Sequence, residues 1–275
     1  MELAVSTDLL LEGRHFRAAA DARKLGHKAL AVNLSDMAAM GAAPRWATLA
    51  LALPAPDEAW LEEFSKGFFA LAGRFGVELI GGDTTRGSLS ICITILGEVP
   101  SGLALFRAGA GPGDDIWVSG QLGGAALALE RPGDPANAKR QDEPEPRVEL
   151  GERLRGLASA AIDVSDGFAQ DLGHILERSG AGAVVEYASL PRPAEVGEIE
   201  DANLQARLVL CGGDDYELVF TAPQAKRGEL AALEAELKLP LSRVGVIQGP
   251  QATLQVLDAK GRPMRVGRGF DHFAP

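Results

Sequence analysis

Short apolar runs and longer helical stripes follow one another along the first hundred residues. Runs typical of strands lie at residues 2–5, 45–53, 77–80 and 89–99. Between them, residues 24–40 repeat apolar side chains near helical spacing, and Asp57 is a suitable N-cap for a second amphipathic helix. The predicted order is strand, helix, strand, helix, strand, strand, which is an α/β (α+β) arrangement.

The remaining residues repeat strands and helices after a glycine- and proline-containing connection at residues 100–113. Strands are predicted at residues 115–119, 160–162, 182–187, 216–221, 241–247 and 252–257, and helices at residues 125–129, 168–180 and 224–237. For the polar, proline-rich segment at 130–145 we expect no fixed structure. We therefore predict two domains, an N-terminal domain at residues 1–105 and a C-terminal α/β domain at residues 106–275.

Composition narrows the class of protein. The 275 residues are 46% hydrophobic, and the net charge is −11, which disfavours nucleic acid or an anionic membrane as the main partner. The chain has two cysteines, Cys92 and Cys211, far apart in the sequence, which favours a reduced, cytoplasmic protein. We see no apolar run long enough to span a bilayer and no signal peptide, so we expect no membrane association.

Carboxylates recur where an apolar run meets glycine or serine. They are Asp8 after Ser6-Thr7, Asp83 after Gly81-Gly82, Asp163 with Asp166 around Ser165, and Asp214 with Asp215 after Gly212-Gly213. Each could be only a turn former or a helix cap, and Ser165 and Asp166 are suitable caps for the helix that follows them. Asp36 forms, with Asn33 and Ser35, a polar island in an otherwise Ala/Leu/Met-rich helical segment, where a polar group needs a partner. The recurrence favours a site at the ends of strands.

These carboxylates indicate magnesium chemistry. Asp163 and Asp166 are close enough to repel one another unless a cation lies between them. Oxygen ligands, few histidines and no Cys/His cluster suit Mg²⁺ better than zinc. The glycine turn at 120–124 opens a helix but lacks the Lys-Ser/Thr of a P-loop. The residues alone therefore predict a Mg²⁺-dependent nucleotide enzyme without a Walker motif. Such an enzyme accelerates phosphoryl transfer mainly by positioning the substrates and neutralising the phosphate charge.

Seven stretches in this order resemble the thiamine-monophosphate kinase family, which belongs to the superfamily of aminoimidazole ribonucleotide synthetase. They are VSTDLLLEGRHF (5–16), LGHKALAVNLSDMAAMGAAP (25–44), LIGGDTTRG (79–87), FRAGAGPGDDIWVSGQLG (106–123), AAIDVSDGFAQDLGHIL (160–176), GGDDYELVFT (212–221) and GFDHF (269–273). The resemblance implies transfer of the γ-phosphate of ATP to thiamine phosphate, giving thiamine diphosphate. It also implies a homodimer in which two N-terminal mixed sheets pair into a barrel-like interface, with an α/β domain outside each.

The resemblance also implies roles for individual residues. Thr7, Asp8, Asp36, Asp83, Asp163 and Asp166 correspond to magnesium ligands, with Ser6 helping at one ion. Gly82, Asp83, Arg107 and Ser165 correspond to contacts with ATP. His15 and Phe270 correspond to contacts with thiamine phosphate, together with an acidic residue of the GGDDYEL stretch, which is Asp214 by our alignment, with Glu217 as the alternative.

One departure separates this sequence from the family pattern. Family members begin with a segment that ends in a glycine and paired-aspartate motif and supplies one magnesium ligand. Here Met1 lies inside the next strand, so we expect that ligand to be missing, either because the sequence is truncated or because this copy has lost it.

The departure keeps a second hypothesis open, a non-catalytic protein that binds nucleotide or thiamine phosphate. A third hypothesis is another ATP-dependent enzyme of the same superfamily. A selenophosphate synthetase would need a reactive cysteine near the N-terminus, and the hydrogenase-maturation enzyme a C-terminal cysteine; neither is present.

Overall fold

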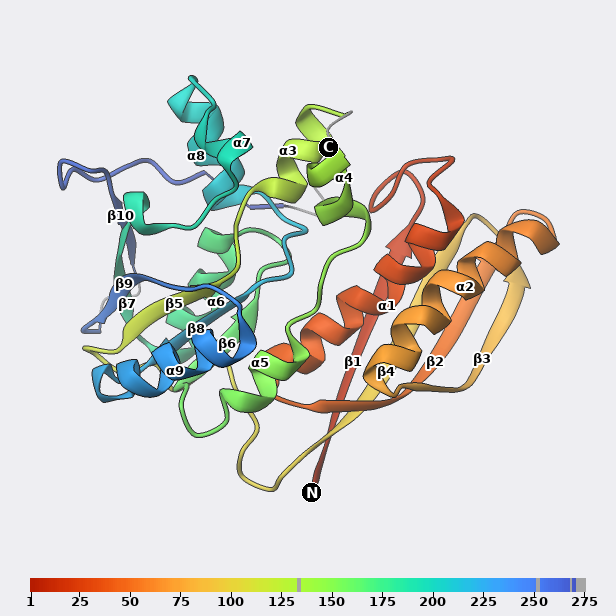
Figure 1. Ribbon diagram of the computed structural model, residues 1–275, viewed down its shortest axis with the longest axis horizontal. Helices are drawn as coiled ribbons and strands as arrows, with labels where there is room; N and C mark the ends of the chain where they lie inside the picture. The colour runs from red at the N-terminus through yellow and green to blue at the C-terminus, as the bar shows by residue number, and fades with distance from the viewer. Residues whose placement is uncertain (133–134, 251–252, 268, 271–275) are drawn as a thin grey trace.

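The protein is described by a computed structural model that covers residues 1–132, 135–250, 253–267 and 269–270. Two sheets with their helices lie side by side (Figure 1). In this part of the chain, none of the helices has the length and apolar character that a membrane span needs.

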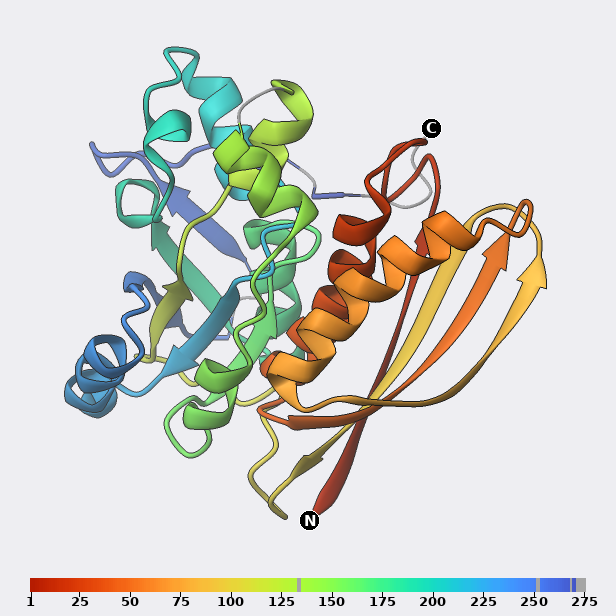
Figure 2. The same ribbon diagram turned by 45° about the vertical axis from the view of Figure 1, so that its right-hand side comes forward.

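The N-terminal sheet is mixed, and among the described residues helices cover only one of its faces. Its strand order is β1-β4-β2-β3, with β2 and β3 parallel and the other pairs antiparallel. The strands are β1 (Glu2–Leu11), β2 (Ala43–Leu53), β3 (Glu78–Arg86) and β4 (Ser90–Val99). Helices α1 (Ala22–Ala39) and α2 (Glu58–Phe75) lie together across one face, and the opposite face is open (Figure 2). The predicted order of these six elements is confirmed.

The second sheet has six strands in the order β10-β7-β9-β5-β8-β6. They are β5 (Asp115–Ser119), β6 (Ala160–Asp163), β7 (Gly182–Glu186), β8 (Leu218–Ala222), β9 (Leu241–Gln248) and β10 (Leu254–Leu257). The helices in this half of the chain are α3 (Gly124–Glu130), α4 (Pro135–Asp142), α5 (Val148–Arg153), α6 (Phe168–Ser179), α7 (Ala194–Gly197), α8 (Ala202–Cys211) and α9 (Arg227–Leu237), with short 3₁₀ turns η1 (Tyr187–Ser189) and η2 (Gln224–Lys226). The mixed α/β class is confirmed.

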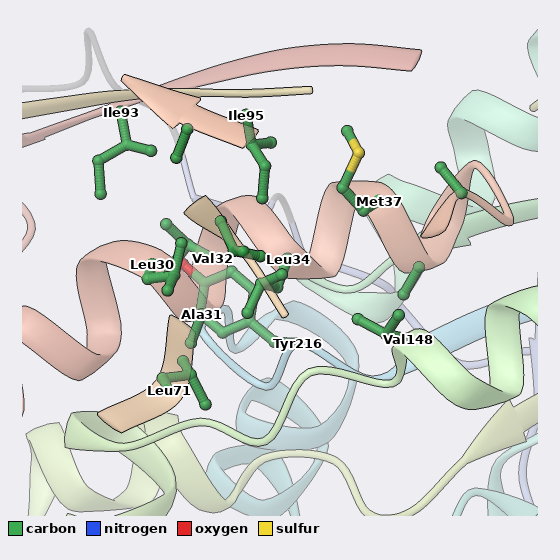
Figure 3. Close-up of a cluster of buried hydrophobic side chains, with 14 of the residues drawn as sticks. Leu30, Ala31, Val32, Leu34, Met37, Leu71, Ile93, Ile95, Val148 and Tyr216 are labelled. Carbon is green, nitrogen blue, oxygen red and sulfur yellow. The ribbon is translucent and has the colours of Figure 1, made fainter. Parts of the chain in front are cut away.

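Helix α1 is the centre of the molecule. Its side chains pack against Ile93 and Ile95 of β4 on one side and against Val148 and Tyr216 of the C-terminal half on the other (Figure 3). Leu30 and Leu34 of α1 are fully buried in this shared core. Because both halves of the chain pack on α1, a polar residue on this helix is held at a fixed place relative to each of them.

Four sequence predictions about local structure are wrong. Strand β1 does not end at Ser6-Thr7-Asp8 but continues to Leu11, and β3 does not end at Gly81-Gly82 but continues to Arg86, because each run pairs with a neighbouring strand along its whole length. The polar segment at 130–145 contains α4, which packs on α3 and α1. The apolar run before Gly212 is the end of helix α8 and not a strand.

Candidate functional site

A cavity of about 660 Å³ gathers most of the predicted site residues. Its wall is formed by the end of β1 and the loop after it, by one face of α1, by α3 and α4, and by the loops that follow β6 and precede β8. The predicted residues in its lining are Asp8, His15, Asp36, Asp163, Ser165, Asp166, Asp214 and Phe270. Residues from both sheets therefore meet around one space.

Three carboxylates meet where β1, α1 and β6 come together. The Ser6 hydroxyl donates to Asp36 Oδ2 over 2.6 Å, and the Ser35 hydroxyl donates to Asp163 Oδ2 over 2.7 Å. Asp8 lies on the same face of β1 as Ser6, since the two are separated by one residue. The two serines fix the orientation of Asp36 and Asp163, and with Asp8 the three form the acidic cluster.

Burial and mutual repulsion disfavour the charged forms of the acidic cluster. Burial, and then the neighbouring Asp36, raise the pKa of Asp8 to about 7. Burial, and then Asp36, raise the pKa of Asp163 to about 8. Burial also raises the pKa of Asp36, against the hydrogen bond from Ser6 and the nearby charge of Arg107. A bound cation would offset both the unfavourable free energy of burying these charges and the repulsion between them.

The donor set of the acidic cluster fits Mg²⁺ shared with a phosphate. Among the described residues, no three His, Cys, Asp or Glu side chains are arranged to hold a metal ion by themselves. Mg²⁺ usually takes one or two carboxylates and completes its shell with water and substrate phosphates. Separate carboxylates around an open cavity match that mode better than a closed protein cage.

The loop between β6 and α6 is shaped by Asp171. The backbone N–H groups of Ser165, Asp166 and Gly167 donate to Asp171 Oδ2 over 3.1, 3.1 and 3.0 Å. The expectation that Ser165 and Asp166 cap α6 is therefore wrong: Gly167 is the N-cap residue, without a side-chain bond, and a carboxylate inside the first turn binds the loop. This leaves the side chains of Ser165 and Asp166 at the cavity wall.

Phe270 is connected to the same loop. Its backbone N–H donates to the carbonyl oxygen of Asp166 over 2.9 Å, and the Arg14 guanidinium lies 4.8 Å from the centre of its ring. Gln170 donates to Asp166 Oδ2 over 3.0 Å and to the Phe270 carbonyl over 3.3 Å. The last three residues of the GFDHF motif, at 271–273, lie outside the described residues.

The two acidic candidates of the GGDDYEL stretch differ in their surroundings. Asp214 lines the cavity and forms an ion pair with Lys28. Glu217 is 5% exposed and accepts from Arg147 Nε and Nη2 over 2.7 and 2.6 Å and from Ser119 over 2.6 Å. The geometry therefore favours Asp214 over Glu217 as the residue that faces a ligand.

Asp83 is not brought to the acidic cluster within one chain. It pairs with Ala50, which pairs with Cys92, which pairs with Leu9, so three strand spacings of about 4.8 Å separate it from β1, roughly 14 Å. Residues paired across a ladder share a face, and Leu9 lies on the open face, opposite Asp8. Gly82, the next residue along β3, is also at this distant edge.

Two further candidates do not line the cavity. The Thr7 side chain points to the open face, where its hydroxyl shares a hydrogen bond of 2.8 Å with Thr94. Arg107 lies on the exposed connection between the two sheets and acts on Asp36 by its charge. Neither lines the cavity in a single chain.

Comparison with known proteins supplies the family. Residues 1–99 match the model of AIR synthase related protein, N-terminal domain, and residues 111–256 match that of its C-terminal domain. The thiamine-monophosphate kinase of Salmonella typhimurium is 45% identical over 283 residues, covering 99% of this chain and 87% of that protein. This chain belongs to the thiamine-monophosphate kinase family.

Solved structures agree with this family. The thiamine-monophosphate kinase of Stenotrophomonas maltophilia K279a has a TM-score of 0.90 and 46% identity, covering 96% of this chain and 86% of that one. A second structure, described as AaThiL complexed with AMPPCP and TMP, has a TM-score of 0.85 and 29% identity, covering 98% of this chain and 87% of that one.

Some features of this cavity could not be identified from motifs. Lys28 lies in the family-like stretch 25–44 but was not predicted as a site residue; it lines the cavity eight residues before Asp36, on the same side of α1. The glycine turn before α3 is not open to a phosphate: Asp215 accepts from the backbone N–H of Gly123 over 2.7 Å and of Ala125 over 3.4 Å. The chain itself thus supplies the anion at this helix terminus.

Proposed function

We propose that this chain transfers the γ-phosphate of ATP directly to thiamine phosphate, giving thiamine diphosphate. The observation that carries the proposal is the cavity lined by the acidic cluster in one region and by Asp214 and Phe270 in another. Family membership supports it, and so does a structural neighbour complexed with AMPPCP and TMP.

Asp8, Asp36, Asp163 and Asp166 would hold Mg²⁺, with Ser6 orienting Asp36. When bound, Mg²⁺ supplies positive charge that balances the phosphate oxygens of both substrates. Ser165, at the cavity wall, would contact ATP, as would Arg107, whose charge acts close to Asp36. A general base is not required, because phosphoryl transfer depends mainly on alignment and charge balance.

The acceptor would be bound by His15, Asp214 and Phe270. Leu11 donates its backbone N–H to His15 Nδ1 over 3.0 Å, so the neutral imidazole carries its proton on Nε2. Asp214 offers an acceptor oxygen, and Phe270 offers an aromatic face. These three groups suit a substrate with flat rings and N–H donors at one end and a phosphate at the other.

We also propose that two copies pair through the open faces of their N-terminal sheets, in the barrel-like manner that the family resemblance implies. Support comes from the large apolar side chains exposed on this sheet, which are Leu3, Val5, Leu9, Leu11 and Ile80. An exposed apolar face of this kind is characteristic of an interaction surface. Pairing would give Asp83 and Thr7, which face away from the cavity of their own chain, a neighbouring subunit.

Two coarser expectations remain proposals. A domain boundary near residue 105 is supported by the two family matches, which end at residue 99 and begin at residue 111. A cytoplasmic location is supported by Cys92 and Cys211, which are both unpaired.

The test is turnover of the whole chain with ATP, Mg²⁺ and thiamine phosphate, followed by chromatography of thiamine diphosphate. The kinase function is supported if thiamine diphosphate forms in proportion to the amount of protein and if Asp36→Asn lowers the rate of its formation by at least about 100-fold. Calorimetric binding of thiamine phosphate and AMPPCP without product would instead establish a non-catalytic binding protein. If neither binding nor product is seen, the assignment of this cavity is wrong.

A further inference from the structure

Lys28 is a buried cation inside the cavity. Its side chain is 4% exposed, and its Nζ lies 2.8 Å from Asp214 Oδ2. With the Gln141 amide turned so that its oxygen faces Lys28, that oxygen accepts from Nζ over 3.2 Å. A buried ammonium is costly unless it is paired, so the ion pair with Asp214 holds both side chains in place.

Asp214 is fixed by its backbone as well as by Lys28. Its φ is +66° and that of Tyr216 is +49°, both in the left-handed region that residues other than glycine rarely adopt. The backbone N–H of Asp214 donates to the carbonyl of Ser165 over 3.0 Å. Strained backbone of this kind persists where surrounding contacts determine it, and it concentrates at functional sites.

Both carboxylate oxygens of Asp214 are engaged from inside the protein. Lys28 binds Oδ2, and the Tyr216 hydroxyl donates to Oδ1 over 3.0 Å. Burial, and then the charge of Asp214, raise the pKa of Tyr216 well above its ordinary value, so its hydroxyl keeps the proton that it donates. A carboxylate oxygen has more than one lone pair, so each can still accept from a ligand in the cavity.

Helix α1 sets the distance between the two ends of the cavity. Lys28 and Asp36 are eight residues apart, which is about 12 Å along a helix. One rigid, buried element therefore carries the residue that orients Asp214 and a carboxylate of the acidic cluster.

We propose that Lys28 is a positioning residue for the acceptor substrate: it fixes the Asp214 carboxylate, with Tyr216, in the orientation that accepts hydrogen bonds from the substrate ring. The proposal rests on the proposed function of this cavity. Lys28 acts through Asp214, so its removal weakens binding of thiamine phosphate and leaves the ATP end unchanged. Loss of one charge-assisted hydrogen bond corresponds to about a 10- to 100-fold change in affinity.

The experiment compares Lys28→Met, Lys28→Gln and Lys28→Arg with wild type. We expect the KM for thiamine phosphate to rise about 10- to 100-fold in Lys28→Met, with kcat and the KM for ATP within about twofold of wild type. The KM of Lys28→Gln for thiamine phosphate should lie between those of wild type and Lys28→Met. Lys28→Arg should have a KM closer to that of wild type than Lys28→Met has. Lys66→Met is the matched control, because Lys66 is 47% exposed on α2 and pairs only with Glu62 and Glu63 in the described ion pairs.

A double-mutant cycle with Asp214→Asn separates this proposal from a general loss of structure. If Lys28 acts through Asp214, the double variant has about the same KM as Asp214→Asn alone. Additive effects would overturn the proposal, as would an unchanged KM in Lys28→Gln. If the circular dichroism signal shows that Lys28→Met does not fold, the same comparison of KM values is made with Lys28→Gln instead.

Calorimetric binding of thiamine phosphate is measured on every variant. A wild-type chain that binds thiamine phosphate without turnover would refute the proposed kinase function, and the role of Lys28 would then be judged on dissociation constants by the same criteria. A wild-type chain that does not bind thiamine phosphate at all would overturn both.

Discussion

The crossing of α1 and α2 offers a sharp test of how the site is held. Gly67 of α2 lies so close to α1 that a Cβ added to it would be 1.8 Å from the carbonyl oxygen of Arg23. At Gly73, on the same helix, an added Cβ would meet no atom within 4 Å. The substitutions Gly67→Ala and Gly73→Ala therefore add the same methyl group to one helix in two different surroundings.

The magnitude follows from these distances. An ordinary contact needs about 3.4 Å or more, so at Gly67 the helices must separate by roughly 1.5 Å. Overpacking of this kind costs about 1–3 kcal/mol, and the upper end applies because a backbone carbonyl cannot rotate away. Alanine returns about 1 kcal/mol through its higher helix propensity. We expect Gly67→Ala to lose about 2 kcal/mol and Gly73→Ala to gain up to about 1 kcal/mol.

The assay is urea unfolding of both variants, with turnover measured on the folded proteins. Because α1 also carries Lys28 and Asp36, a displaced α1 would lengthen the 2.6 Å hydrogen bond from Ser6 to Asp36, so Gly67→Ala should lose activity too. Equal stability of the two alanine variants would contradict the expected clash between Gly67 and the Arg23 carbonyl. A destabilised Gly67→Ala with full activity would show that the helix crossing does not position the site.

Buried charge, metal binding and subunit pairing can each be tested by one further experiment. Arg147→Met should lower the free energy of unfolding by about 3 kcal/mol, because Glu217 would keep its buried charge without its main partner. Urea unfolding measures this free energy, and an unchanged unfolding midpoint would contradict the prediction. Mg²⁺ affinity, measured by calorimetry, should increase between pH 6 and pH 9. The raised pKa values of Asp8, about 7, and Asp163, about 8, mean that at low pH these carboxyl groups keep protons that a cation must displace. An affinity that does not change with pH would argue against these two ligands. Val5→Asp, on the open face of β1, should shift the chain from dimer to monomer in analytical ultracentrifugation, and a dimer of wild-type stability would place the interface elsewhere.

Most elements could be predicted because their signals are local. The apolar stripe of α1 and the alternating pattern of β4 need only nearby residues to be recognised, and the predicted limits of both agree with the structure to within a few residues. The limits of β1 and β3 could not be predicted, because glycine and polar residues end a strand only if no neighbouring strand pairs with them. Helix α4 could not be predicted either, since its polar sequence is stabilised by packing on α1 and α3 rather than by an apolar stripe.

The candidate site could be predicted as a set of residues but not as an arrangement. The motifs contained Asp8, Asp36 and Asp163, and the structure brings them to one cavity. The motifs did not reveal which candidates stay apart: Asp83 follows two glycines, as Asp214 does, yet it lies at the far edge of the sheet.

The family, the α/β class and the identity of the acidic residues could be read from the amino-acid sequence, because these depend on residue types in a fixed order along the chain. The side of the sheet that each residue faces, and the distant residues that meet, follow only from the folded arrangement. Asp8 and Thr7 are neighbours on opposite faces of β1, whereas Lys28 and Asp214 are 186 residues apart and in contact. Strand pairing fixes the first, and the packing of both halves on α1 fixes the second.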